Sequence, residues 1–559
     1  MSYLDLINFP FTLPGSRLII LKESAISLAL STAEYEMSPA EALVCRSLKI
    51  SAGGSFLEWS VQSLDSLKFG DSVRIVFSSL RSITIINNGD LPIELHIDHG
   101  FKSDENSFWR PNLPHAAWAK LSAISHIVAA RNTVSLLVGS DLDLEDFPMA
   151  EDFGERIWSE WMAKAPVVDS DDQEMSNFCW AVLGSNTLEI IPGRNSIVPS
   201  KLGYVAHWQW DAYFIALGVM HGDMGLAREQ IGIALSAQSA NGQLQDVIHD
   251  FGTLRNFSDL PRNEYEFFVQ KRAQALPNPQ DIPLTKPPLT AWAVAKLYER
   301  DVDDSIKWYR TIFAQISLAQ EWWFKYSDFN LDGIPEYQHP YSSGLDDSPI
   351  FDGLRDWTTP DLTSYLILED EVLEQFQRKI NFSGKYDFVK RSRELSQKLT
   401  NSWNEEAEMF PSFLDNEKNF TRSIMNLMPL LVTGVPSALK EILVEQISDP
   451  KLFGGNFRIP TVARDEFEFS ASQMWRGPIW LNTNYLVIDG LRKSGFVDLS
   501  AEISARTLEM VKEAGGPVEY YDAVTGLKPS RAVGAFSWSA ALFIQMAVEK
   551  HEGTSGSIR

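Results

Sequence analysis

The chain has 559 residues, of which 44% are hydrophobic and 22% charged, and both proportions are ordinary for a soluble globular protein. A chain of this length exceeds what one hydrophobic core supports, so we expect two domains. The formal net charge of −25 argues against nucleic acid or a membrane as the main partner, because both require a basic protein surface.

Cysteine content and the N-terminal sequence bear on the compartment. The chain has two cysteines, Cys45 and Cys179, so we expect a reducing environment rather than a disulfide scaffold. The N-terminal segment lacks a basic region followed by an apolar run, so no signal peptide is predicted. No window approaches the roughly 20 apolar residues that a membrane span requires. These features predict a cytoplasmic protein.

Residues 1–150 are predicted to be rich in β-strands. Short β-branched runs occur at 72–77 and 81–86, and residues 91–97 alternate strictly between apolar and polar. The Asn-Asn-Gly-Asp sequence at 87–90 predicts a turn of the hairpin kind. A further strand is predicted at 133–138. We expect a β-sandwich-like accessory domain without chemistry of its own.

From residue 151 to 550 long helical patterns replace the short strands, and loops rich in glycine and proline join them. This alternation suggests a toroid of helix pairs, an (α/α)6 barrel, although periodicity alone would equally allow another all-α bundle or a solenoid. The tail at 551–559 is predicted to be disordered. The predicted helices are 150–164, 211–239, 288–326, 361–380, 385–407, 438–447, 483–494 and 499–514.

Two acid-bearing segments far apart in the sequence are the main chemical signal. HPYSSGLDDSP at 339–349 contains Asp346, and PVEYYDAVTG at 517–526 contains Glu519. Each acid lies among turn-forming residues beside aromatic rings. Cleavage of a glycosidic bond needs two such acids, one to protonate the leaving oxygen and one to activate water or attack carbon. The pair predicts a sugar hydrolase.

Tryptophans beside charged groups support a sugar site. Trp210 precedes Asp211 and Trp475 precedes Arg476, and both pairs lie in loop-like sequence. Because sugar rings have apolar faces and hydroxyl edges, their sites combine aromatic platforms with polar groups. Other tryptophans at helical spacing are assigned to the core, namely Trp292, Trp308 and Trp322.

Other catalytic classes find little support. No HExxH, Cys/His cluster, GxSxG, P-loop or GxGxxG sequence occurs, which disfavours zinc enzymes, serine esterases and nucleotide enzymes. The segment 328–339 resembles the start of a calcium loop, but His339 stands at the twelfth position, where a bidentate Glu belongs. A solvated acidic turn is the favoured interpretation of this segment. The calcium alternative would use Asp328, Asn330, Asp332 and Glu336.

Taken together, the motifs resemble glycoside hydrolase family 63, which groups processing α-glucosidase I with bacterial α-glucosidases and mannosylglycerate hydrolases, and which is related to the family 37 trehalases. The resemblance covers roughly residues 170–545. It implies an (α/α)6 barrel, inversion at the anomeric carbon, Asp346 as general acid and Glu519 as general base. Asp347 is the less favoured alternative for the acid. The motifs are WQWDAYFIALG (208–218), TKPPLTAWAVAKLYE (285–299), DGIPEYQHPYSSGLDDSP (332–349), MWRGPIWLNTNYLVIDGL (474–491) and PVEYYDAVTG with FSWSAAL (517–542).

The resemblance also implies residues that hold the cleaved sugar, and the chain departs from the family pattern at several of them. Lys286 stands where many relatives have Gln, and it could meet a carboxylate or phosphate of the substrate or lie exposed at a helix start. The sequence QLQD after Gly242 replaces the usual run and brings Gln245 and Asp246 to the edge of the site. Tyr341 and Ser342 replace the common Trp and Glu. The residues carried over by the match are Trp210, Asp211, Gly344, Trp475 and Arg476.

The predicted activity is that of an inverting, exo-acting α-glycosidase for a small α-glucoside or α-mannoside. It is predicted to need no cofactor and to have a small molecule or oligosaccharide as its partner, with the oligomeric state left open. Two alternatives remain, a sugar-binding protein without turnover and a polysaccharide or uronide lyase built on the same helical toroid.

Overall fold

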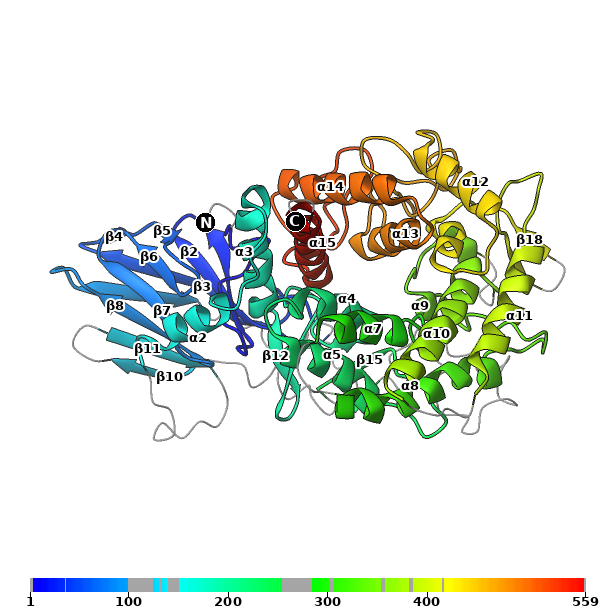
Figure 1. Cartoon of the computed structure of the whole chain (residues 1–559). Coiled ribbons are helices and arrows are strands. Elements are labelled where there is room, and N and C mark those ends of the chain that lie inside the picture. The colour runs from blue at the N-terminus through cyan, green and yellow to red at the C-terminus, as the bar shows by residue number, and fades with distance from the viewer. Residues whose placement is uncertain are drawn as a thin grey trace.

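The computed structural model describes residues 4–35, 37–98, 124–129, 133–138, 150–250, 252–253, 284–301, 306–352, 357–381, 386–414 and 417–556. Figure 1 shows two parts, an N-terminal β-domain beside a ring of helices. No helix among these residues is long and apolar enough to cross a membrane.

Two antiparallel sheets make up the β-domain. The first has the strand order β1-β2-β3-β4, with β9 also paired to β3, and the second has the order β10-β11-β8-β7-β6-β5. The strands are β1 (Leu18–Ser24), β2 (Ser27–Thr32), β3 (Leu43–Ala52), β4 (Ser55–Phe56), β5 (Trp59–Val61), β6 (Ser66–Phe69), β7 (Val73–Ser79), β8 (Ser82–Asn87), β9 (Ile93–Asp98), β10 (Ile124–Ala129) and β11 (Thr133–Val138).

The four predicted strands are present, but the predicted hairpin is wrong. The alternation in β9 leaves Ile93, Leu95 and Ile97 half-buried while the residues between them are exposed. However, β9 pairs with β3 rather than with β8, so the turn at 87–90 crosses from one sheet to the other. The reason is backbone geometry, since neither Asn88 nor Gly89 has the positive φ that a type I′ hairpin turn requires.

Six elements form the inner ring of the barrel within the described residues. Each packs on the next, and the last returns to the first. Helix α4 is buried at every position, as expected for a helix enclosed on all sides. The inner elements are α4 (Gln209–Val219), α7 (Thr290–Arg300), α10 (Pro360–Lys379), the 3-10 helix η5 (Ile424–Leu431), α13 (Leu481–Lys493) and α15 (Ser537–Gly556).

An outer layer of amphipathic helices covers this ring. Helix α11, for example, buries one stripe that includes Phe388, Leu395 and Leu399 and exposes most of its other residues. This arrangement of inner and outer helices confirms the predicted (α/α)6 barrel. The outer helices are α3 (Ser170–Ser185), α5 (Met224–Ser236), α8 (Ile306–Tyr326), α11 (Phe388–Asn401), α12 (Ser437–Ser448) and α14 (Val497–Glu513).

The helix predictions differ from the structure at several boundaries. The pattern at 211–239 is two helices, because the chain breaks at Gly222 and the Asp223 carboxylate caps α5 by accepting from Leu226 N. The pattern at 288–326 is likewise α7 and α8. Helices α3 and α15 are absent from the prediction, and α15 extends to Gly556, past the point where a disordered tail is predicted to begin.

Shorter elements complete the fold. They are α2 (Phe153–Met162), β12 (Thr187–Ile191), β13 (Arg194–Ile197), β14 (His207–Trp208), β15 (Val247–His249), β16 (Gly252–Thr253), α9 (Pro340–Ser343), η4 (Pro349–Phe351), β17 (Ser412–Leu414) and β18 (Glu417–Asn419).

A buried lysine joins the β-domain to the barrel. Lys201 is 1% exposed, and its ammonium donates to Leu13 O at 3.0 Å, to Thr12 Oγ1 at 3.3 Å and to Ser16 O. Burial holds the pKa of this ammonium well below its ordinary value. The Trp158 indole also donates to Thr12 O, at 3.2 Å. These polar contacts accompany an apolar one, since the ring of Phe9 packs on that of Phe178 with centroids 5.3 Å apart.

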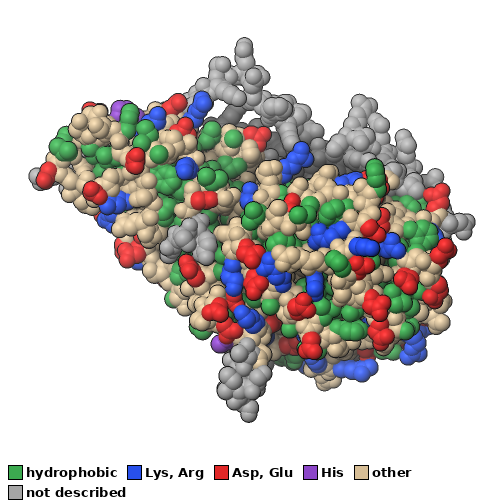
Figure 2. Space-filling model, turned by 90° about the horizontal axis from the view of Figure 1, so that it is seen from above, with side chains coloured by type: hydrophobic (Ala, Val, Ile, Leu, Met, Phe, Trp, Pro, Cys, Tyr) green, Lys and Arg blue, Asp and Glu red, His purple; other side chains and the backbone are tan. Residues whose placement is uncertain are grey.

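The face of the molecule seen in Figure 2 has acidic and basic side chains interspersed among polar and apolar ones. On this face charges of both signs are therefore mixed rather than gathered into a field of one sign.

Candidate active site

The inner helices all begin at the same end of the barrel, and the predicted site residues lie at these starts. Trp210 and Asp211 occupy the first turn of α4, and Trp538 occupies the first turn of α15. Lys286 precedes α7, and Trp475 precedes α13.

Aromatic rings form a continuous wall at this end. The rings of Trp475 and Trp480 stack with centroids 3.6 Å apart, and Trp480 stacks in turn on Tyr520 at 4.8 Å. Trp210 lies 6.1 Å from Trp475 and 5.9 Å from Trp538 between ring centroids. Such a wall matches the apolar face of a sugar ring.

Gly344 brings the loop that carries the first acid against this wall. A Cβ added at Gly344 would lie 2.2 Å from Trp210 Cζ2, and the residue has a φ of +72°. Both facts exclude other side chains, because no Cβ fits and the left-handed backbone favours glycine. The close approach of Gly344 to Trp210 fixes where Asp346, two residues later, can lie.

The Asp346 side chain is 39% exposed, but its Oδ1 atom is buried and accepts no hydrogen bond. Lys286 Nζ lies 3.9 Å from that oxygen. Burial raises the pKa of Asp346 to about 7, against the opposing effect of Lys286 and with further increases from Asp246, Asp347 and Glu519. Asp346 can therefore hold a proton near neutral pH.

Glu519 is 3% exposed and is held by two donors. Tyr204 donates its hydroxyl to Oε1 at 2.8 Å, and Val533 N donates to Oε2 at 3.0 Å. Its backbone is fixed as well, since Glu519 N donates to Val533 O at 2.9 Å. Burial raises the pKa of Glu519 to about 7, although both hydrogen bonds favour the ionised form.

Asp211, Asp246 and Lys286 form a buried charged cluster beside Asp346. Lys286 Nζ lies 3.2 Å from Asp246 Oδ1 and donates to Tyr341 O at 2.6 Å. Burial raises the pKa of Asp211 well above its ordinary value, and Lys286 opposes this increase. Because Lys286 is 6% exposed, the alternative of an exposed lysine at a helix start is wrong.

The three remaining residues predicted to bind the sugar each contact a neighbouring side chain. Gln245 is buried and donates to Ser239 Oγ at 2.8 Å. The Tyr341 ring packs edge-on to His339 at 4.4 Å. Arg476 forms an ion pair with Asp352.

Asp347, the alternative acid, is placed differently from Asp346. Its Oδ1 accepts from Trp475 N at 2.8 Å. Asp347 therefore links its loop to the aromatic wall.

The candidate calcium loop is closed by its own backbone. Gly333 N donates to Asp328 at 3.0 Å, Asp332 N donates to Asn330 at 2.9 Å, and Phe329 N donates to Glu336 at 3.1 Å. Over the described ranges, no group of three or more His, Cys, Asp or Glu side chains is arranged to hold a metal ion. The structure therefore describes a hydrogen-bonded turn here.

Sequence reasoning missed Tyr204, whose hydroxyl contacts Glu519. Its signal is weak, because a lone tyrosine 315 residues before its partner shows no local pattern. Trp480 and Trp538 were also not singled out, although both lie within the motifs WRGPIW and FSWSAAL. These motifs could have identified them as part of the aromatic wall.

An internal cavity lies next to the site rather than at its carboxylates. Its lining includes Gln209, Thr285 and Glu369, and it contains neither Asp346 nor Glu519. Beside the aromatic wall, the side chains offer one carboxyl that can donate a proton and a second that can accept one.

Comparison with known proteins gives a consistent result. Residues 204–539 match the mannosylglycerate hydrolase MGH1-like glycoside hydrolase domain. Mannosylglycerate hydrolase MGH1 of Selaginella moellendorffii is 22% identical over 501 residues, covering 77% of this chain and 95% of the relative. A GH63 mannosylglycerate hydrolase from Thermus thermophilus, solved in complex with glucose, is 23% identical with a TM-score of 0.57, covering 66% of this chain and 99% of that one. The same enzyme has been solved with Tris and D-glycerate, at a TM-score of 0.56 and 22% identity, covering 66% of this chain and 98% of that one.

Proposed function

Because this chain belongs to the mannosylglycerate hydrolase MGH1-like glycoside hydrolases of family 63, we propose that it is an inverting, exo-acting hydrolase of a small α-glucoside or α-mannoside. Its class is that of a glycoside hydrolase. The sugar, the linkage and the stereochemical course are the proposed part.

The observation that carries the proposal is the pairing of Asp346 with Glu519. The two acids come from distant loops, yet both adjoin the aromatic wall, because Asp347 accepts from Trp475 N and Tyr520 stacks on Trp480. Burial and the charges of both acids raise the pKa of Tyr204. Two carboxyls that titrate near neutral pH beside an aromatic wall have the composition that glycosidic cleavage requires.

In the proposed reaction Asp346 donates its proton to the glycosidic oxygen as the bond from that oxygen to the anomeric carbon breaks. Glu519 accepts a proton from a water molecule, whose oxygen forms the new bond to the anomeric carbon from the opposite face. The products are the free sugar with inverted configuration and the protonated leaving group. Asp346 ends ionised and Glu519 ends protonated, so one proton exchange with solvent restores the enzyme.

The remaining residues are proposed to bind the sugar. Trp210 and Trp475 provide ring faces, and Asp211 accepts hydrogen bonds from sugar hydroxyls. Gly344 keeps residues 344–347, here called the acid loop, against Trp210. Arg476, Tyr341 and Gln245 are proposed to contribute from the edge of the site.

The experiment is anomer-resolved proton NMR of the protein with α-linked glucose and mannose disaccharides, glucosylglycerate and mannosylglycerate. Initial release of a β-anomer from one α-linked compound is the expected result, because inversion places the new hydroxyl on the opposite face. Initial release of the α-anomer would mean retention and would overturn the roles of the two acids.

Two further outcomes identify the alternatives. Tight binding without any turnover would favour a sugar-binding protein. An unsaturated product that absorbs in the ultraviolet would favour a lyase.

A further inference from the structure

We propose that Lys286 and Asp246 form a charge pair that positions Asp346 and sets the pH at which Asp346 gives up its proton. This role rests on the proposed function, in which Asp346 is the general acid. Lys286 and Asp246 act through Asp346 and are therefore positioning residues.

Lys286 is fixed at both ends. Its backbone N–H donates to Gln209 Oε1 at 3.2 Å, which attaches it to the start of α4. Its ammonium donates to Tyr341 O at 2.6 Å and lies 3.2 Å from Asp246 Oδ1. Tyr341 begins the turn that leads to Asp346, so Lys286 connects the first inner helix to the acid loop. A side chain held this way keeps its charge at a constant distance from the acid.

Lys286 is also the cation that faces Asp346 most directly. Its Nζ lies 3.9 Å from Asp346 Oδ1, an oxygen with no hydrogen-bond partner. Arg476 lies near Asp347 but is paired with Asp352. The other ionisable groups that act on Asp346 or Lys286 are Asp211 on α4, Asp246 before β15, Asp347 on the acid loop, Glu519 before α15 and Tyr204 before β14.

Lys286 and Asp246 have opposite effects on the pKa of Asp346. Lys286 alone would stabilise the ionised form of Asp346 and lower its pKa. Burial is the largest influence and raises the pKa of Asp346 to about 7, and Asp246 adds to this increase by opposing the effect of Lys286. Asp246 and Lys286 are both points at which the sequence departs from the family pattern, and the structure places these two departures in contact.

The test measures the basic limb of kcat/KM against pH, with the substrate identified by the NMR panel. Asp246→Asn leaves Lys286 unneutralised, so we expect the limb to move to lower pH by about one unit. Lys286→Met removes the cation, so we expect a shift of about one unit to higher pH. The double variant removes both charges and should return the limb close to that of the unmodified enzyme.

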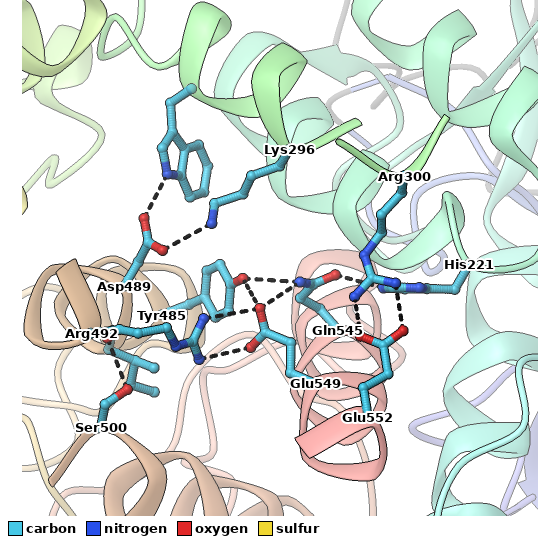
Figure 3. Close-up of polar contacts among 12 residues, drawn as sticks. His221, Lys296, Arg300, Tyr485, Asp489, Arg492, Ser500, Gln545, Glu549 and Glu552 are labelled. Atoms are coloured by element: carbon cyan, nitrogen blue, oxygen red, sulfur yellow. Dashed lines mark hydrogen bonds and ion pairs between the residues drawn. The ribbon is translucent and has the colours of Figure 1, made fainter. Parts of the chain in front are cut away.

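A second lysine–aspartate pair in the same barrel provides a matched control. Lys296 and Asp489 lie 2.9 Å apart in the second halves of α7 and α13, away from the helix starts (Figure 3). The double variant Lys296→Met/Asp489→Asn removes an ion pair of the same chemistry. It should leave the basic limb in place.

Opposite shifts in the single variants with restoration in the double variant would support the proposal. Loss of kcat in both single variants without any movement of the limb would overturn it, because a purely structural role predicts that result. Carboxyl-carbon NMR of protein labelled at aspartate, with Asp346→Asn for assignment, follows the same titration without turnover. If the carboxyl titration shifts as expected but no glycoside is hydrolysed, the proposed function fails while the pairing holds.

Discussion

The two ends of the barrel are built from the same residue types, yet they treat charge in opposite ways. At the end where the inner helices begin, Asp346 and Glu519 have pKa values raised to about 7. At the other end, burial opposes the ionisation of Asp489, but Lys296 and Lys493 hold its pKa well below the ordinary range. Glu519 and Asp489 are both buried, so the difference between these two carboxyls lies in the cations close to Asp489.

At the far end the carboxylates that Figure 3 shows are each paired. Lys296 lies 2.9 Å from Asp489, which also accepts from the Trp292 indole at 2.9 Å. The remaining pairs are Arg492 with Glu549 at 3.0 Å and Arg300 with Glu552 at 2.6 Å. Cations near helix C-termini are favoured by the helix dipole, which suits α7 and α13.

The comparison teaches that burial alone does not make a catalytic acid. Two lysines act on Asp489 and keep it ionised, whereas burial outweighs the single lysine beside Asp246 and Asp346 and raises the pKa of both. At the end that carries Asp346 and Glu519, the nearby cations do not offset the effect of burial on these acids.

The largest effect is expected from neutralising the acids at the site end. Asp346→Asn and Glu519→Gln should each lower kcat by about 10³-fold or more, because each removes a proton transfer in the transition state. Turnover and circular dichroism on the same preparations measure the effect and check the fold. Near-full turnover in either variant would remove that residue from the proposed mechanism.

At the far end the corresponding change should affect stability rather than catalysis. Lys296→Met leaves Asp489 buried without its nearest cation, and we expect a loss of about 3 kcal/mol in the free energy of unfolding. Lys296→Met/Asp489→Asn should recover most of this loss. Urea denaturation provides the measurement, and an unchanged midpoint in the single variant would contradict the stabilising role.

The two ends should also respond to pH with opposite signs. Because Glu519 has a raised pKa, its ionisation destabilises the fold increasingly as pH rises toward 7, so Glu519→Gln should stabilise by about 1–3 kcal/mol at pH 8 and by little at pH 4. Because Asp489 has a lowered pKa, its stabilisation is present at neutral pH and is lost as pH falls through and below about 4. Asp489→Asn should therefore destabilise at pH 8. Thermal unfolding of both variants across this pH range tests the two predictions. A change of stability in the same direction for both variants at pH 8 would contradict the comparison.

The smallest effect is expected from Tyr204→Phe. The hydroxyl favours the ionised form of Glu519, so its loss should raise the pKa of Glu519 and move the acidic limb of kcat/KM up by roughly half to one pH unit. The basic limb, which belongs to Asp346, should stay in place. A pH profile of kcat/KM measures both limbs, and movement of the basic limb alone would contradict this assignment.

The strands and helices could be predicted from the sequence because local residue patterns encode them. The strand alternation at 91–97 and the long helical patterns depend on neighbouring residues, and the inner and outer helices confirm the barrel. The break between Val219 and Met224 was missed because apolar residues resume after it, although Asp223 offered a capping signal.

The site was predictable to a similar degree. Asp346 and Glu519 stand out because each lies in a distinctive motif. The contact of Lys286 with Asp246 and that of Tyr204 with Glu519 join distant segments, and no spacing rule predicts them. Their roles depend on charges and hydrogen bonds that form only once the ring of helices closes.

Lys201 also limits which N-terminal segments the barrel can accept. Its ammonium belongs to the barrel, but its three acceptors are encoded within the first 16 residues. Replacement of this N-terminal segment would leave the buried Lys201 amine without acceptors unless the new segment supplied oxygen atoms at the same place. The segment is therefore exchangeable only together with the buried lysine that it satisfies.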